Sequence, residues 1–242
     1  MKNSTNQTNF CNPLSQLDSF LISTEEFQEN LSHAKSARIL VFSDSHGNRQ
    51  QIERILSYFS GHIDAIAFCG DGISDLLSII EDVQDCVLPF TIPPVTAFVC
   101  GNNDSSAFPM EFPVSFRQSA CSQIVKIPQC LVFTACGHKI FMTHGHRYGV
   151  YSSLENLEHE AQIVGADFVF FGHTHVPQFE YRKCILLNPG SISLPRSYSS
   201  PSFAMVTIFA EKKQMEASFY RIERSGNQEF YKLYSPESFI LH

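Results

Sequence analysis

Carboxylates and imidazoles recur in a few short segments of this 242-residue sequence, in pairs that suit metal binding. Asp44 and His46 lie two positions apart in the chain, with one residue between them, and the same spacing separates His144 from His146 and His173 from His175. Together with single acid and amide positions, the segments offer seven oxygen and nitrogen donors: Asp44, His46, Asp71, Asn102, His144, His173 and His175. Such a mixed set suits Mn, Fe, Zn, Co or Ni better than Ca or an all-oxygen Mg site.

Each segment follows an apolar run rich in Val, Ile and Phe, which predicts a strand that ends at the segment. Asp71 lies between glycines at the end of such a run, and its two carboxylate oxygens make it the natural ligand to bridge two ions. Taken singly, the Asp-x-His pair, Asp71 and Asn102 also fit ordinary turns, so none of them decides the chemistry. The run Phe168 to Phe171 leads directly into His173 and His175, and two buried imidazoles are costly without a metal or hydrogen-bond partners.

Composition excludes some partners. The formal charge of -7 disfavours a broad basic face, and with it electrostatic capture of nucleic acid or an anionic membrane. Bound cations would instead attract an anionic substrate locally. The eight cysteines show no Cys-x-x-Cys spacing, no leader peptide or membrane-spanning run is recognisable, and we therefore expect a reducing, cytoplasmic location.

The segments need a scaffold, and the hydrophobic pattern predicts one. Residues 1–36 are expected to form a loose tail, up to residue 16, and an appended helix that a Ser23-x-x-Glu26 capping box opens toward Ala34. Residues 37–242 are expected to form one domain. It begins with a strand at 38–42, a helix at 49–59 and a second strand at 64–68.

The rest of the chain predicts more strands than helices. We expect helices at 73–80 and 153–164, and a loop at 103–114 because of Pro109 and Pro113. The expected strands are 95–99, 123–127, 131–134, 139–142, 167–171, 184–188, 203–209 and 214–221. Those of the second half are expected to form a second sheet packed on the first, with the helices outside.

The ordered motifs Asp-x-His, Gly-Asp, Gly-Asn-x-Asp, His and Gly-His-x-His resemble those of the calcineurin-like metallophosphoesterase superfamily. Within it, the segments Thr143 to His146 and Asn188 to Ser191 are most similar to the small prokaryotic phosphodiesterase branch. The resemblance covers about residues 38–210. It implies an α/β fold, a four-layer αββα sandwich of two mixed sheets.

The resemblance also implies two divalent metal ions, for which we name manganese first and keep Fe, Zn, Co and Ni as alternatives. One metal would be held by Asp44, His46, Asp71 and His175, and the other by Asp71, Asn102, His144 and His173. A hydroxide bridging the two ions would then hydrolyse a small phosphoester, in the first instance a phosphodiester.

The sequence departs from the superfamily pattern at Asn103, where many members place a histidine that contacts the substrate. An amide cannot donate a proton as an acid, so we expect esters with low-pKa leaving groups to be preferred. His146 is our candidate for a phosphate contact, and Arg196 is a weaker one that also fits an exposed loop arginine. With Asp71 and Asn103, His146 completes the predicted catalytic set.

Two alternatives remain open. One is a catalytically weak scaffold or binding protein that keeps the fold, similar to the metallophosphoesterase-like subunit of the retromer coat. The other is a phosphomonoesterase. The presence of all seven donors favours an enzyme. The physiological substrate and the oligomeric state are left open by the sequence.

Overall fold

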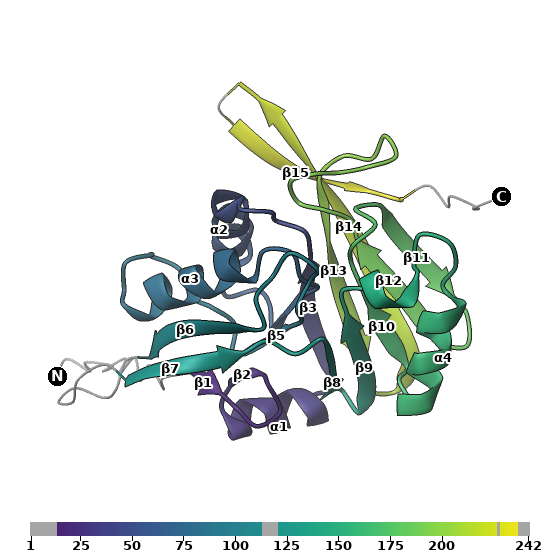
Figure 1. The fold of residues 1–242 in the computed structure, drawn as a ribbon, viewed down its shortest axis with the longest axis horizontal. Helices are drawn as coiled ribbons and strands as arrows, with labels where there is room; N and C mark the ends of the chain where they lie inside the picture. The colour runs from purple at the N-terminus through teal and green to yellow at the C-terminus, as the bar shows by residue number, and fades with distance from the viewer. Residues whose placement is uncertain (1–13, 113–120, 227, 237–242) are drawn as a thin grey trace, which may run out of the picture.

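The computed structural model of the chain describes residues 14–112, 121–226 and 228–236, which form two main sheets and a small hairpin sheet (Figure 1). The larger sheet has the order β1-β2-β5-β4-β3-β13-β14-β15. Its strands are β1 (Ser15–Gln16), β2 (Ile22–Ser23), β3 (Ser36–Phe42), β4 (Ala65–Phe68), β5 (Val95–Phe98), β13 (Ser202–Phe209), β14 (Lys212–Ser225) and β15 (Gln228–Tyr234). The smaller sheet has the order β11-β12-β10-β9-β8. Its strands are β8 (Cys130–Ala135), β9 (His138–Thr143), β10 (Phe168–Phe170), β11 (Pro177–Tyr181) and β12 (Ile185–Pro189).

Both main sheets are mixed. Strands β3, β4 and β5 run parallel, whereas β13 and β14 pair antiparallel beside them. In the smaller sheet β9, β10 and β12 are parallel, and the edge strands β8 and β11 are antiparallel. The parallel strands therefore end at a common edge in each sheet.

The central hydrophobic core lies between the two sheets. Alternate side chains of β3, such as Ile39 and Val41, belong to the same buried cluster as Ile140, Phe168 and Phe170 of the smaller sheet. Since strand side chains alternate between faces, Leu40 and Phe42 point the other way, into a second cluster under the helices.

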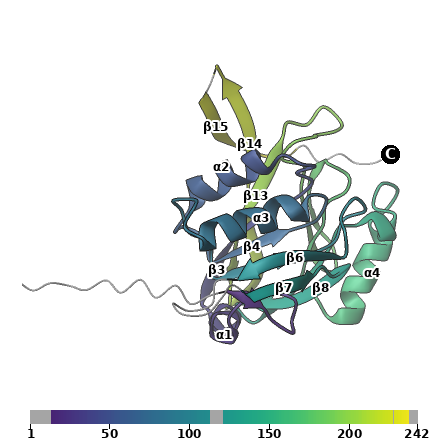
Figure 2. The same ribbon diagram turned by 60° about the vertical axis from the view of Figure 1, so that its left-hand side comes forward.

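Helices cover the outer face of each sheet (Figure 2). Helix α2 (Arg49–Phe59) begins at Asn48, whose side chain accepts a hydrogen bond from the backbone of Gln51, and α3 (Ile73–Gln84) lies beside it on the larger sheet. Helix α4 (Glu155–Val164) buries Leu157 and Ala161 against the smaller sheet. The predicted αββα sandwich of two mixed sheets is confirmed.

The predicted division of strands between the sheets is wrong at the C-terminal end. β13 pairs antiparallel with β3, with Ala204 opposite Val41, so β13 and β14 extend the first sheet. An alternating apolar pattern identifies a strand but not its partner, and the long return of the chain to β3 depends on tertiary packing. β11 and β15 were not predicted. The hairpin of β14 and β15 projects beyond the body of the sandwich (Figure 1).

The expected loop at 103–114 is also wrong in part, because residues Ala107–Phe112 form β6, which pairs with β7 (Cys121–Lys126) in a two-stranded sheet. Pro109 lies opposite Ile124 in this sheet. With one partner strand only, a proline can lie with its missing N–H on the free side, which is why it does not prevent pairing here. Pro113 lies outside the described residues.

The lead-in before residue 37 contributes to the sheet and to the core. Helix α1 (Glu25–His33) confirms the predicted helix, but its cap is Thr24, whose hydroxyl accepts from the backbone N–H of Phe27, and not Ser23. Ser15 and Gln16, expected in the tail, form β1, and Leu31 is buried in the core between the sheets. Residues 1–13 lie outside the described residues, and the domain boundary at 36 stays a prediction. No helix in the described ranges is long and apolar enough to cross a membrane.

Candidate metal centre

The predicted metal ligands follow the parallel strands of both sheets, and the structure brings them together at one edge of the sandwich. Asp44 and Asp71 follow β3 and β4 of the larger sheet, while His144 follows β9 of the smaller one. His173 and His175 follow β10. Since the carboxyl ends of parallel strands share an edge, packing the two sheets face to face places the two sets opposite each other.

Five of these residues have a left-handed backbone conformation, with φ of 56° at Asp44, 46° at His46, 57° at Asp71, 68° at His173 and 59° at His175. This region is unfavourable for residues other than glycine and is typical of functional sites. Backbone hydrogen bonds across the loops hold the conformation: Asp44 N donates to Gly70 O at 2.9 Å, and His46 N donates to Asp71 O at 3.1 Å. The strain turns these side chains toward a common point.

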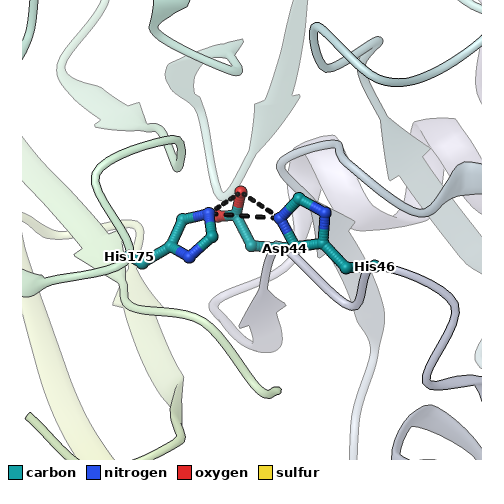
Figure 3. A group of neighbouring side chains, drawn as sticks. All are labelled: Asp44, His46 and His175. Carbon is teal, nitrogen blue, oxygen red and sulfur yellow. Dashed lines mark hydrogen bonds and ion pairs between the residues drawn. The ribbon is translucent and has the colours of Figure 1, made fainter. Parts of the chain in front are cut away.

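One group of ligands consists of Asp44, His46 and His175, whose ligand atoms all lie within 4.8 Å of one another. Both imidazoles point at the Asp44 carboxylate from opposite sides (Figure 3). His175 Nε2 lies 3.2 Å from Asp44 Oδ1 and also 3.2 Å from His46 Nε2. Asp44 is fully buried, and among the described residues Oδ1 has no hydrogen-bond partner of good geometry.

A second group consists of Asp44, Asp71 and His144, again within 4.8 Å. His144 Nε2 lies 3.4 Å from Asp71 Oδ2, 3.2 Å from Asn102 Oδ1 and 3.2 Å from His173 Nδ1. Asp71 Oδ2 also lies 3.7 Å from His46 Nε2 in the first group. Asp44 belongs to both groups, whereas Asp71 belongs to the second and lies near His46 of the first. Bridging of two metals by Asp71 therefore stays a prediction.

The hydrogen bonds of the imidazoles show what these groups require. His144 Nδ1 lies 2.7 Å from the carbonyl oxygen of Cys69, which can only accept, so Nδ1 carries a proton. In the neutral ring the lone pair of Nε2 then faces the oxygens of Asp71 and Asn102. His175 Nδ1 is held in the same way by the carbonyl of Leu194. The imidazole lone pairs and the carboxylate and amide oxygens are all acceptors, so a positive charge is needed between them. Orientation of the ring by a hydrogen bond to a carbonyl is typical of metal-binding histidines.

The pKa shifts follow the same electrostatics. Burial lowers the pKa of His144, but the carboxylates of Asp71 and Asp44 outweigh burial and raise it, which means that the position attracts positive charge. Burial opposes ionisation of Asp71, yet hydrogen bonds from His144 and Asn103 bring its pKa well below the usual range. Burial and the neighbouring His144 lower the pKa of His173 to about 4. The orphaned Asp44 oxygen, the anionic Asp71 and the neutral His173 fit divalent metal binding.

Two positioning residues were missed by sequence reasoning. The Asp104 carboxylate accepts hydrogen bonds from the backbone N–H groups of Asp71, Gly72, Ile73 and Gly101, at 2.7 to 3.0 Å. It therefore ties the loop after β4 to the loop after β5. Asn188 is fully buried, and its side-chain amide donates to Gly172 O at 2.8 Å, which supports the His173 segment. Both lie in motifs that the sequence displays, but their roles depend on contacts between distant loops.

The remaining predicted residues lie around the ligands. Asn103 donates to both carboxylate oxygens of Asp71, from its backbone N–H at 2.8 Å and from its side chain at 2.7 Å. The half-buried ring of His146 lies 5.5 Å from the ring of His144, and its pKa is lowered by burial and by His144. Arg196 is exposed and donates to the hydroxyl of Tyr151, a residue that the sequence did not single out.

Comparison with known proteins identifies the family. The profile of the calcineurin-like phosphoesterase superfamily domain matches residues 38–211. The chain belongs to this superfamily. The probable metallophosphoesterase YsnB from Bacillus subtilis is 30% identical over 191 residues, which cover 78% of this chain and 93% of YsnB. Phosphodiesterase YfcE from Escherichia coli K12 is 39% identical over 69 residues, which cover 28% of this chain and 34% of YfcE.

Solved structures agree with this superfamily assignment. A predicted phosphoesterase from Streptococcus pneumoniae superposes with a TM-score of 0.57 at 26% identity, over 81% of this chain and 98% of its own. Vacuolar protein sorting 29 from Cryptosporidium parvum shares the fold, with a TM-score of 0.55 at 17% identity over 82% and 97% of the two chains. The superfamily, the fold and the Asp and His groups fit metal-dependent hydrolysis of a phosphoester.

Proposed function

We propose that the protein is a phosphodiesterase that uses two divalent metal ions, with manganese as the first candidate. The observation that carries the proposal is the meeting of two ligand groups that share the Asp44 carboxylate, one with His46 and His175 and the other with Asp71 and His144. A single ion would use one group and leave the acceptors of the other unsatisfied. The name of the relative YfcE supports the diester assignment.

The bound ions would supply positive charge for the phosphoester and lower the pKa of a water molecule. The chain's own residues provide the rest. Asp71 stays ionised because Asn103 and His144 hold its oxygens, and His173 stays neutral above a pH of about 4 and can donate its lone pair. His146 lies beside His144 and His173 with its Nδ1 buried and without a hydrogen-bond partner among the described residues, which suits a contact with a phosphate oxygen.

Asn103 bears on the choice of substrate. Its side chain donates to Asp71, and an amide cannot protonate a leaving group. We expect aryl phosphodiesters, whose leaving groups have a low pKa, to react much faster than alkyl diesters. Equal rates across leaving groups would contradict this role for position 103.

The test is turnover of an aryl phosphodiester by the purified chain with manganese, compared with Fe, Zn, Co and Ni. We expect activity that a chelator abolishes and that His173→Ala removes. The matched control is His159→Ala, an exposed histidine on α4, which should leave the rate unchanged.

The same experiment separates the alternatives. No turnover with any of the metals would favour the scaffold or binding protein. Faster hydrolysis of the matching monoester would favour a phosphomonoesterase. The cytoplasmic location and the small phosphoester partner stay predictions.

A further inference from the structure

Tyr151 links two loops at the rim of the metal centre. It follows the short helix η1 (His146–Tyr148), is 48% exposed, and donates its hydroxyl to the backbone carbonyl of His173 at 2.9 Å. Its ring packs edge-on against the ring of His173, with the ring centres 5.0 Å apart. The same hydroxyl accepts a hydrogen bond from the guanidinium of Arg196. Neither the metal ligands nor the predicted substrate contacts include Tyr151.

Arg196 completes the link from the other loop. Its backbone N–H donates to the carbonyl of His175 at 3.2 Å, and its guanidinium carbon lies 5.8 Å from the centre of the Tyr151 ring. Tyr151 and Arg196 therefore each bind the carbonyl of one histidine of the His173-x-His175 pair, and they also bind each other. Both histidines have the strained left-handed backbone conformation, and the two hydrogen bonds to their carbonyls help to hold it.

The guanidinium of Arg196 keeps donors free for a ligand. A guanidinium has five N–H donors in a rigid plane, and the bond to Tyr151 uses one of them. In the described part of the chain, Asp and Glu carboxylates lie beyond ion-pair distance of Arg196, whereas many other arginines, such as Arg54 and Arg182, have such a partner. The Arg196 guanidinium is held over an aromatic ring beside the candidate metal centre. An arginine held in this way is better placed to bind an anionic oxygen than an arginine that moves freely in solvent.

We propose that Tyr151 is a positioning residue, which holds the Arg196 guanidinium at the rim of the metal centre to bind an anionic oxygen of the phosphoester. This inference rests on the proposed function only in naming a phosphoester as the anion. Tyr151 acts through Arg196, because its own hydroxyl is occupied by the carbonyl of His173 and by the guanidinium.

The test is a double-mutant cycle in the manganese-loaded protein. Tyr151→Phe keeps the ring and removes the hydroxyl, and we expect KM for the aryl diester to rise about tenfold, the size of one lost hydrogen bond to a charged group, while kcat changes less than about twofold. Arg196→Gln should raise KM at least as much. The double variant should resemble Arg196→Gln alone, because Tyr151 acts only through Arg196. Tyr181→Phe, an exposed tyrosine on β11, is the matched control.

Binding of inorganic phosphate, measured by calorimetry on the same manganese-loaded proteins, is independent of turnover. If the wild type is inactive, the proposed function fails, but Tyr151→Phe should still weaken phosphate binding about tenfold. Three results would overturn the inference: unchanged KM and phosphate affinity, additive effects of the two substitutions, or loss of bound manganese together with kcat. The last would mean that Tyr151 only supports the metal ligand His173.

Discussion

The two sheets make unequal contributions to the metal centre. The larger sheet supplies oxygen ligands, Asp44, Asp71 and Asn102, together with one imidazole, His46. The smaller sheet supplies imidazoles alone. The oxygen side carries the negative charge and the nitrogen side carries the other imidazoles, so neither sheet by itself holds the full ligand set.

The two sides are also held by opposite chemistry. On the oxygen side, N–H groups fix the carboxylates: Asn103 donates to Asp71, and the backbone of His173 donates to Asp44. On the nitrogen side, carbonyl oxygens fix the rings, as Cys69 O does for His144. On each side, at least one ligand is held by a hydrogen bond to a residue that follows a strand of the other sheet. The bond between Cys69 and His144 joins the two sheets, and so does the bond between His173 and Asp44. The centre therefore forms only when the two sheets pack on each other.

Glycines allow this close approach. A Cβ at Gly172 would collide with the Ser43 hydroxyl and lie 2.9 Å from Asp44 Oδ2. The φ of Gly172 needs no glycine, so the requirement here is space between the sheets.

The largest effect is expected from Asp71→Asn, which removes a negative charge from the oxygen side while keeping its shape. We expect activity to fall at least about a thousandfold, an order found when electrostatic stabilisation of the reacting charge is removed, and both metals to bind more weakly. Elemental analysis of the purified variant measures the metals. Two ions retained at wild-type affinity would contradict a bridging role for Asp71.

Asp104→Ala should have the largest effect on stability, because four backbone N–H groups of the oxygen side lose their acceptor. We expect the free energy of unfolding in the metal-free protein to fall by about 3 kcal/mol, since bonds to a charged acceptor are lost and donors are left unpaired. Denaturant unfolding measures it. Asp18→Ala, at an exposed position, should change it by less than about 0.5 kcal/mol, and a similar loss in both variants would refute the role of Asp104.

Asn188→Ala tests the nitrogen side in the same way. The buried amide donates to Gly172 O and to the Thr174 hydroxyl, so its removal should cost about 2 kcal/mol of the free energy of unfolding. We also expect weaker metal binding, because the His173 and His175 segment loses its support. Should Asn188→Ala prove more damaging to stability than Asp104→Ala, the oxygen side would not be the more firmly held of the two.

The smallest effect concerns the titration of His173 in the metal-free protein. Its pKa is lowered by burial and by His144 to about 4, below the value of about 6.5 for a free histidine. As the pH falls, His173 is protonated in the unfolded chain before it is protonated in the folded protein. The free energy of unfolding therefore decreases between about pH 6.5 and about pH 4. NMR titration of the imidazole measures the pKa directly. A pKa at or above 6.5 would show that the nitrogen side is not poised to bind metal at neutral pH.

Much of the fold follows from local pattern. The helix at 49–59 was predicted to the residue, because Ile52, Ile55, Leu56 and Phe59 repeat at helical spacing. The strands β3, β4, β5, β9 and β10 were predicted within two residues at each end, since each is a short apolar run that ends at a polar motif. The pairing of β13 with β3 was not, because any two apolar strands can pair by their sequence alone.

The candidate site divides along the same line. The seven predicted donors do lie together, because side chains that follow parallel strands must meet at the same edge. Which oxygen belongs to which group was not predictable: Asp44 reaches both groups. Asp104, Asn188 and Tyr151 were missed for one reason, since each makes hydrogen bonds to a loop far along the chain.

The amino-acid types and their order along the chain account for the donor chemistry: oxygen and nitrogen donors placed at strand ends, on a chain with a formal net charge of -7. The geometry comes from tertiary packing: the left-handed backbone at the ligands, the carbonyls that orient His144 and His175, and the hydrogen bond between Arg196 and Tyr151. The physical reason is distance along the chain. Hydrophobic periodicity acts over a few residues, whereas His144 and Asp44 are oriented by hydrogen bonds to Cys69 and His173, which exist only after the two sheets have packed.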